Sequence, residues 1–302
     1  MLFDSRRCPD CFAEANGIEI CYQFFGESDA SPLVMINGLG SQMINWHEDF
    51  CLQLAARGYR LIRFDNRDTG LSTRFDDSGV PDLNRFAEAK EKGGRAEPPY
   101  TLLDMARDAV GLLDALGIES AHFLGSSMGG RIGQLIAINH PHRIRTLTCM
   151  VSSMGESGFP PPNPDVIELL FMAAPSDRAG YIEHYIRLCR MLSGSKLGID
   201  EDYARKKAER CFKRSFNPEG EIRQAAALMT AGSNKERLGS IRTPTLIING
   251  SDDPLISVDC AKDMEKTIPR AKLMIIEGMG HGISDTPQVW PQVIEAIALH
   301  AV

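Results

Sequence analysis

The sequence lacks the features that would direct a chain to a membrane or to nucleic acid. No run approaches the ~18 consecutive apolar residues of a membrane-spanning helix. The first residues, MLFDSRR, contain no apolar core of a secretory signal, so we expect no export. The net charge is −7 and there is no basic cluster. Neither nucleic acid nor an anionic membrane is therefore expected as a partner.

The eight cysteines show no disulfide framework, being spread between Cys8 and Cys260. In a chain of 302 residues such spacing is typical of free thiols in a reducing compartment, so we expect a cytoplasmic protein. Cys8 and Cys11 form a C-x-x-C pair, but no second pair or nearby histidine completes a zinc site. The sequence predicts no metal, and leaves a role for this pair open.

Short apolar runs alternate with amphipathic segments, which is typical of parallel strands joined by crossover helices. The expected buried strands are residues 33–36, 61–64, 121–124, 147–151, 246–248 and 273–276. Residues 18–25 alternate in polarity and should belong to an antiparallel edge hairpin. The predicted helices begin after a capping box of Thr101 and Asp104, near residue 128 and near residue 288. We expect a polar loop over 76–99.

This alternation stops between about residues 155 and 239. The interval opens with a stiff, proline-rich segment, PPPNP. Its helical periodicity covers residues 166–173, 181–192, 203–212 and 222–229. A helical block between two strands should cover the carboxyl edge of the sheet, where open α/β sheets bind ligands. We therefore expect an α/β core over 1–155 and 240–302, with a helical lid over 156–239.

The segment AHFLGSSMGG places a G-x-S-x-G pattern between an apolar strand and a helix. Gly125 and Gly129 leave room for a tight, strained turn that exposes Ser127. A serine hydroxyl becomes a useful nucleophile only with a base within hydrogen-bond reach. We predict Ser127, and not Ser126, as the nucleophile. The alternative is a glycine-rich helix start without chemistry.

Two later strand ends supply candidate partners for this serine. Asp252 and Asp253 both follow the strand at 246–248. Asp253 comes three residues after Gly250, in a G-x-x-D arrangement, and directly before Pro254, which favours it as the acid. His281 follows the strand at 273–276 between two glycines. It has little packing role there and is predicted to be the base. The remaining histidines are interpreted as structural.

Acyl transfer also requires hydrogen-bond donors for the oxyanion that develops in the tetrahedral intermediate. The backbone N–H of Met128, directly after the predicted nucleophile, is one candidate. The other is the backbone N–H of Leu39, in the segment INGLG after an early strand. An ordinary strand–helix turn is the alternative explanation of Gly38 and Gly40.

These segments together resemble the α/β-hydrolase superfamily over nearly the whole chain. Ser127, Asp253 and His281 follow one another in the order of that fold. The nearest likeness is to bacterial esterases of the aclacinomycin methylesterase type. It rests on the motifs DNRDTGLS, GSSMG, DP and GMGH, which start at residues 65, 125, 253 and 278.

The resemblance implies that the DNRDTGLS turn is structural and carries no chemistry. This chain has Asn37 before Gly38, where many members have histidine, so it departs from the family pattern at the oxyanion loop. Serine at position 127 argues against the dehalogenases and epoxide hydrolases of the superfamily, which use aspartate.

The sequence thus predicts a serine hydrolase that acts on a small-molecule ester or lactone through an acyl-enzyme, without a cofactor. Apolar residues of the insertion could line a wide pocket for a bulky ester or form the core of the lid: Phe171, Met172, Met191, Leu192 and Met229. The same alternatives apply to Trp46. Two other functions stay open: a C–C bond hydrolase, perhydrolase or cofactor-free dioxygenase on the same fold, and a non-catalytic ligand-binding protein.

Overall fold

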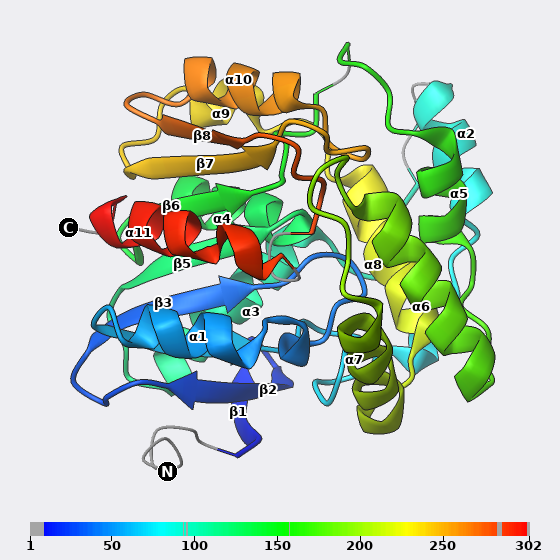
Figure 1. The fold of residues 1–302 in the computed structure, drawn as a ribbon, viewed down its shortest axis with the longest axis horizontal. Coiled ribbons are helices and arrows are strands. Elements are labelled where there is room, and N and C mark those ends of the chain that lie inside the picture. Colours follow the sequence, from blue (N-terminus) through cyan, green and yellow to red (C-terminus); the bar gives the residue numbers. More distant parts are fainter. Residues whose placement is uncertain (1–8, 93, 95, 157, 283–285, 301–302) are drawn as a thin grey trace.

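One eight-stranded sheet forms the centre of the protein (Figure 1). The computed structural model describes residues 9–300 apart from 93, 95, 157 and 283–285. The strand order is β1-β2-β4-β3-β5-β6-β7-β8. Their bounds are β1 Cys11–Ala15, β2 Ile18–Phe25, β3 Ser31–Ile36, β4 Tyr59–Phe64, β5 Ala121–Ser126, β6 Ile144–Met150, β7 Thr245–Gly250 and β8 Lys272–Ile276. The β1–β2 and β2–β4 pairs are antiparallel and the others are parallel.

Helices cover both faces of this sheet, which gives three layers. The helices of the α/β core are α1 Glu48–Ala55, α2 Leu83–Glu91, α3 Leu102–Ala115, α4 Met128–Asn139, α10 Val258–Thr267 and α11 Trp290–His300, with short 3₁₀ helices at Met43–Asn45, Asp76–Ser78 and Pro287–Val289. The predicted capping box of Thr101 and Asp104 is present at the start of α3. Helices α1 and α11 pack on one face, and α3, α4 and α10 on the other.

The central strand β3 shows why the sheet is buried on both sides. Successive side chains of a strand point to opposite faces. Leu33 and Met35 pack with α1 and α11, whereas Val34 and Ile36 pack with α3 and α4. A strand covered on both faces must be apolar at every position. This explains the continuous apolar run from which the strand was predicted.

The chain order reverses at the pair β3 and β5. From β3 the chain continues to β4 on one side, while β5 and β6 lie on the other. A crevice forms outside the carboxyl ends of parallel strands at such a reversal, and this is where α/β sheets bind ligands. The segments that carry Gly38 and Ser127 follow these two strands. Both therefore lie at this edge.

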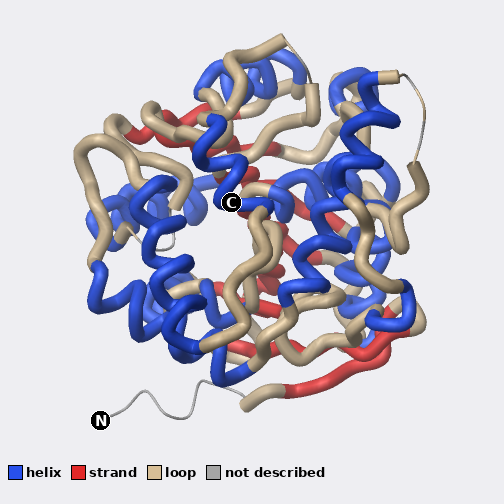
Figure 2. The backbone as a smooth tube through the Cα atoms, turned by 90° about the vertical axis from the view of Figure 1, so that its right-hand side faces the viewer, coloured by secondary structure: helices blue, strands red, loops and turns tan. Residues whose placement is uncertain are grey.

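The described residues between β6 and β7 form five helices, which we call the helical insertion. They are α5 Pro164–Phe171, α6 Arg178–Leu192, α7 Glu201–Arg214, α8 Pro218–Thr230 and α9 Lys235–Leu238. No strand occurs among the described residues of this interval. Figure 1 shows α5–α8 beside the edge to which the β3 arrow points, and Figure 2 looks onto them with the strands behind.

Buried ion pairs fasten the insertion to the turn that follows β4. Arg223 of α8 donates from Nε and Nη2 to the two carboxylate oxygens of Asp68, at 2.9 and 2.8 Å. Arg214 at the end of α7 pairs with Asp65 at 2.7 Å. Asp65 and Asp68 belong to the DNRDTGLS segment. That segment therefore holds the helical insertion on the α/β core.

Two expectations of the sequence are wrong. Residues 76–99 are not simply a polar loop, because α2 lies within them and its Phe86 is buried. This helix packs against α8. A single buried aromatic residue in a polar segment does not produce a helical pattern of apolar residues in the sequence. Cys11 is disulfide-bonded, whereas six other cysteines are not in disulfides. Cys8 lies outside the described residues.

No helix among the described residues is long and apolar enough to cross a membrane.

The Arg223–Asp68 pair gives a prediction about stability. Both side chains have 0% exposure. Arg223→Ala leaves a buried carboxylate without its partner, so we expect the free energy of unfolding to fall by about 3–5 kcal/mol. Arg178→Ala is the control, because its ion pair with Glu209 is exposed and should contribute at most about 1 kcal/mol. Urea unfolding measures both changes. Equal effects would show that the buried pair does not fasten the insertion.

Candidate active site

Ser127 occupies a strained turn between β5 and α4. Its φ of 53° and ψ of −118° lie outside the conformations that a serine ordinarily adopts. Two hydrogen bonds hold this conformation. The Ser127 N–H donates to the Met150 carbonyl at 2.9 Å, and the Ser152 hydroxyl donates to the Ser127 carbonyl at 2.8 Å. The end of β6 thus fixes the turn.

Glycines make the turn sterically possible. A Cβ at Gly125 would lie 2.2 Å from the Gly129 carbonyl oxygen, and one at Gly129 would lie 2.2 Å from the Ile36 carbonyl oxygen. Contacts this short exclude any side chain. Helix α4 therefore begins directly against β3 and β5, as expected from the G-x-S-x-G pattern.

Asp253 and His281 form a hydrogen-bonded pair at the ends of β7 and β8. The His281 Nδ1 and the Asp253 Oδ2 are 2.8 Å apart. The other carboxylate oxygen of Asp253 accepts the N–H groups of Leu255 and Ile256, each at 2.9 Å. An ionised carboxylate so held fixes the proton on Nδ1. The Nε2 atom of His281 is then left as a proton acceptor.

The neighbouring Asp252 has other partners. Its carboxylate accepts hydrogen bonds from the hydroxyls of Ser251 and Ser195. These hydrogen bonds lower the pKa of Asp252, which therefore stays ionised at neutral pH. Of the two adjacent acids, the structure brings Asp253 to His281.

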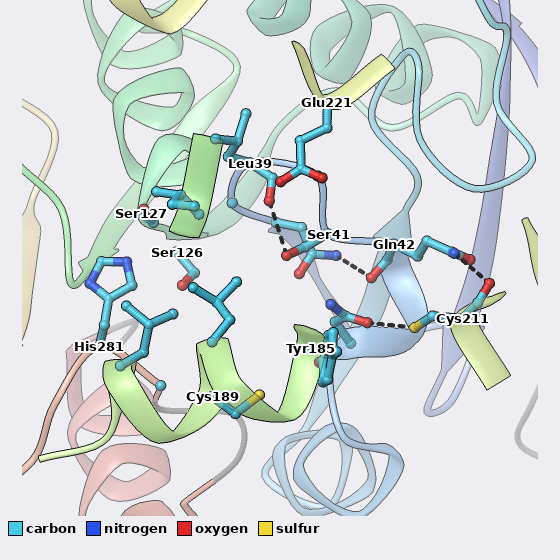
Figure 3. A pocket seen from close by; sticks show the side chains of 18 of the residues that line it. Leu39, Ser41, Gln42, Ser126, Ser127, Tyr185, Cys189, Cys211, Glu221 and His281 are labelled. Atoms are coloured by element: carbon cyan, nitrogen blue, oxygen red, sulfur yellow. Dashed lines mark hydrogen bonds between the residues drawn. The ribbon is translucent and has the colours of Figure 1, made fainter. Parts of the chain in front are cut away.

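Ser127 and His281 line one pocket of about 210 Å³. Figure 3 shows both residues at one side of this pocket, which we call the Ser127 pocket. Ser126 and Leu39 also line it. Helices α5–α8 of the insertion contribute further lining residues, among them Leu170, Tyr185 and Cys211. The structure thus gathers the predicted nucleophile and base, far apart in the sequence, at one cavity.

Two backbone N–H groups are available near Ser127. Leu39 lines the pocket, and a Cβ at Gly38 would lie 3.2 Å from the Ser127 Cβ. Met128 is the first residue of α4. Neither Leu39 nor Met128 uses its N–H in a hydrogen bond within the part of the chain that the structure describes. Their role as oxyanion donors remains a prediction.

Side-chain amides brace the loop that contains Leu39. The Asn37 side chain donates to the Gln42 carbonyl at 3.0 Å, and the Asn66 side chain donates to the Asn37 carbonyl at 3.3 Å. The Gly40 N–H donates to the Gln224 Oε1 of α8 at 2.9 Å. Asn37, the departure from the pattern of related esterases, therefore hydrogen-bonds within its own loop.

The remaining histidines differ in their surroundings. His47 caps α1, His122 hydrogen-bonds Thr146 and His300 hydrogen-bonds the Pro244 carbonyl. His184 was also interpreted as structural, yet it lines the Ser127 pocket. Among the described residues no group of three or more histidines, cysteines or acids could hold a metal ion.

The sequence did not identify the pocket lining from the insertion correctly. Of the five apolar candidates only Leu192 lines the Ser127 pocket, and Met172 is 47% exposed. Trp46 lines the pocket but is itself buried and stacks on Phe50. The insertion contributes these polar or ionisable side chains, none of them predicted: Tyr181, His184, Tyr185, Cys189, Lys207, Cys211 and Glu221. Helical periodicity finds an apolar face but not the neighbour that covers it.

A family model described as alpha/beta hydrolase fold matches residues 31–287. The chain belongs to the α/β-hydrolase family. It is 30% identical over 278 residues to a rhodomycin D methylesterase from Streptomyces sp. strain C5, covering 85% of this chain and 87% of the relative.

Solved α/β hydrolases superpose on nearly the whole chain. An esterase from Exiguobacterium antarcticum has a TM-score of 0.74 at 21% identity, with 97% of this chain and 99% of that chain covered. A meta-cleavage product hydrolase from Pseudomonas fluorescens IP01 has a TM-score of 0.72 at 20% identity, with 95% and 97% covered. At these identities the likeness shows the fold alone.

The Asp253–His281 pair gives a prediction that uses two adjacent acids. Asp253→Asn keeps the size of the side chain but can hold His281 in the wrong tautomer, so kcat should fall about 10⁴-fold by analogy with serine proteases. Asp252→Asn is the matched control and should leave kcat nearly unchanged. Steady-state kinetics on any ester that the wild type hydrolyses measures both. A larger loss in the Asp252 variant would reverse the assignment.

Proposed function

We propose that this α/β hydrolase is a serine-dependent carboxylic ester hydrolase. The observation that carries the proposal is the strained Ser127 in one pocket with His281, whose Nδ1 is hydrogen-bonded to Asp253. Its similarity to a rhodomycin D methylesterase supports an enzyme that cleaves esters.

The geometry favours a two-step reaction through an acyl-enzyme. Ser127 Oγ attacks the ester carbonyl while His281 Nε2 accepts its proton, and the protonated imidazole then delivers that proton to the leaving alcohol. Asp253 keeps the His281 ring in the required tautomer and stabilises its cationic form. Water, activated by the same histidine, then releases the acid and restores the serine.

The backbone N–H groups of Leu39 and Met128 are proposed to bind the oxyanion. A donor of this kind contributes about 10²–10³ in kcat when the transition state forms. The hydrogen bonds of Asn37 and Gly40 keep the loop of Leu39 in place before the substrate arrives. The donors therefore need little reorganisation during the reaction.

We further propose that the helical insertion, residues 156–239, acts as a lid over the Ser127 pocket. The pocket of about 210 Å³ is smaller than the 300–1,000 Å³ typical of sites for drug-sized ligands. A bulky ester or lactone therefore requires α5 and α6 to move outward, while the buried ion pairs of Arg214 and Arg223 keep the end of α7 and α8 on the α/β core. Apolar Leu170, Leu188, Leu192 and Leu255 surround the ester in this proposal.

The nucleophile is tested by substitution of the two adjacent serines. Ser127→Ala should reduce kcat by roughly 10⁴–10⁶-fold, the range found for serine proteases. Ser126→Ala should retain most of the activity, since Ser126 ends β5 and does not occupy the strained turn. Circular dichroism checks that both variants fold. An unchanged rate in the Ser127 variant would reject the mechanism.

The substrate class is tested with a panel of esters. If the insertion opens for a bulky substrate, esters with large acyl groups and lactones should have a higher kcat/KM than acetate esters. Turnover of acetates alone would reject the bulky-substrate proposal. A ring-cleavage diketone hydrolysed faster than every ester would instead favour a C–C bond hydrolase with the same residues.

A further inference from the structure

A second acidic side chain faces the Ser127 pocket from the insertion. Glu221 lies in the first turn of α8 and lines both this pocket and an adjoining cavity of about 40 Å³. In Figure 3 its carboxylate points from α8 toward Leu39 and Ser41. The carboxylate is therefore directed at the cavity in which the ester would bind.

The carboxylate of Glu221 forms no hydrogen bond or ion pair with any residue that the structure describes. Arg214 at the end of α7 pairs with Asp65, and Arg223 of α8 pairs with Asp68. Glu221 is half-buried, and an unpaired carboxylate that is partly shielded from water is destabilised unless a partner compensates its charge. A bound ligand can supply that partner.

Burial raises the pKa of Glu221 to about 7, and no neighbouring cation among the described residues offsets this effect. Its position in the first turn of a helix favours the charged form. Burial also raises the pKa of Tyr181, with a smaller contribution from Glu221. The Tyr181 hydroxyl therefore stays protonated. Above pH 7 the pocket thus contains a carboxylate at Glu221.

The loop that contains Leu39 lies between Glu221 and the nucleophile. A Cβ at Gly40 would lie 2.6 Å from the Glu221 Cδ, and one at Gly38 would lie 3.2 Å from the Ser127 Cβ. Two residues of chain span at most ~7 Å. The chain between these two contacts is therefore short, and the side chains of Glu221 and Ser127 line the same pocket.

This loop does not depend on the Glu221 carboxylate for its own support. Its Gly40 N–H donates to Gln224, and Asn37 donates within the loop. Because the Glu221 carboxylate forms no hydrogen bond with the described residues of this loop, recognition of a ligand explains its position better than support of the loop does.

We propose that Glu221 is a specificity-determining residue that binds a protonated amino group of the substrate while the ester carbonyl lies at Ser127. The inference rests on the proposed ester hydrolysis and deepens it. A cation is the favoured ligand because it neutralises the carboxylate, and charge-assisted hydrogen bonds are the strongest of their kind.

The test uses the complete chain and pairs of methyl esters, assayed above pH 7. One member of each pair is an ω-aminoalkanoate, and the other is its isostere with a methyl group in place of the ammonium group. Across a series of chain lengths, we expect the wild type to prefer the amino ester most strongly at one length. Glu221→Gln should lower kcat/KM for that ester about 10- to 100-fold and leave its isostere nearly unaffected.

Glu219→Gln is the matched control, since Glu219 lies in the same turn of α8 but is exposed. This variant should keep the wild-type kcat/KM for both esters. Equal losses for both esters in the Glu221 variant would overturn the inference, because they would indicate a role in positioning the loop. A wild type that hydrolyses both esters of every pair equally fast would overturn it too.

A binding measurement separates this inference from the proposed reaction. Calorimetry on Ser127→Ala measures the affinity for the amino ester with and without the additional substitution Glu221→Gln. If the wild type hydrolyses neither ester but binding depends on Glu221, ester hydrolysis fails and the amine site stands. If both esters are hydrolysed alike and binding ignores Glu221, only the amine site fails.

Discussion

The turn at Ser127 exists because no side chain occupies the space on either side of it. Gly125 and Gly129 have no Cβ and lie directly against backbone atoms. Because of this, β5 passes into α4 without a connecting loop. Ser127 is thereby held in a conformation with positive φ at the edge of the sheet. Strain of this kind costs about 1–3 kcal/mol and persists only where the surroundings fix it. Here the end of β6 provides that support.

A second constraint holds the insertion to the α/β core. The turn after β4 contributes Asp65 and Asp68, which receive Arg214 and Arg223 from α7 and α8. Gln224 of α8 bonds both this turn and Gly40 of the loop that contains Leu39. The DNRDTGLS segment, which has no proposed catalytic role, therefore connects α7 and α8 to the loop that contains Leu39. A displacement of α8 would be transmitted to that loop.

Much of the core could be predicted because its physical causes are local in the sequence. A continuous apolar run follows from burial on two faces, and a capping box follows from the unsatisfied N–H groups of a helix start. The positions of Ser127, Asp253 and His281 after strand ends could also be predicted. Parallel strands deliver such residues to one edge, where Ser127 and His281 line one pocket and Asp253 is hydrogen-bonded to His281.

The lining of the pocket could not be predicted in the same way. Helix α8 was predicted from its period, but Glu221 is only one of several acids in that region. Its direction depends on how α8 lies against Gly40, a contact between positions 181 residues apart. The same limit applies to Phe171 and Met172. Their apolar character is evident from the sequence, but the sequence does not show which residues they contact. Long-range packing of the insertion decides these positions.

The account is tested most directly by reaction with a fluorophosphonate, followed by mass spectrometry of the digested protein. We predict one adduct, on Ser127, whose rate of formation falls sharply when His281 is replaced by alanine. Labelling at another serine, or labelling of Ser127 at an unchanged rate without the histidine, would contradict the claim that the two side chains act together.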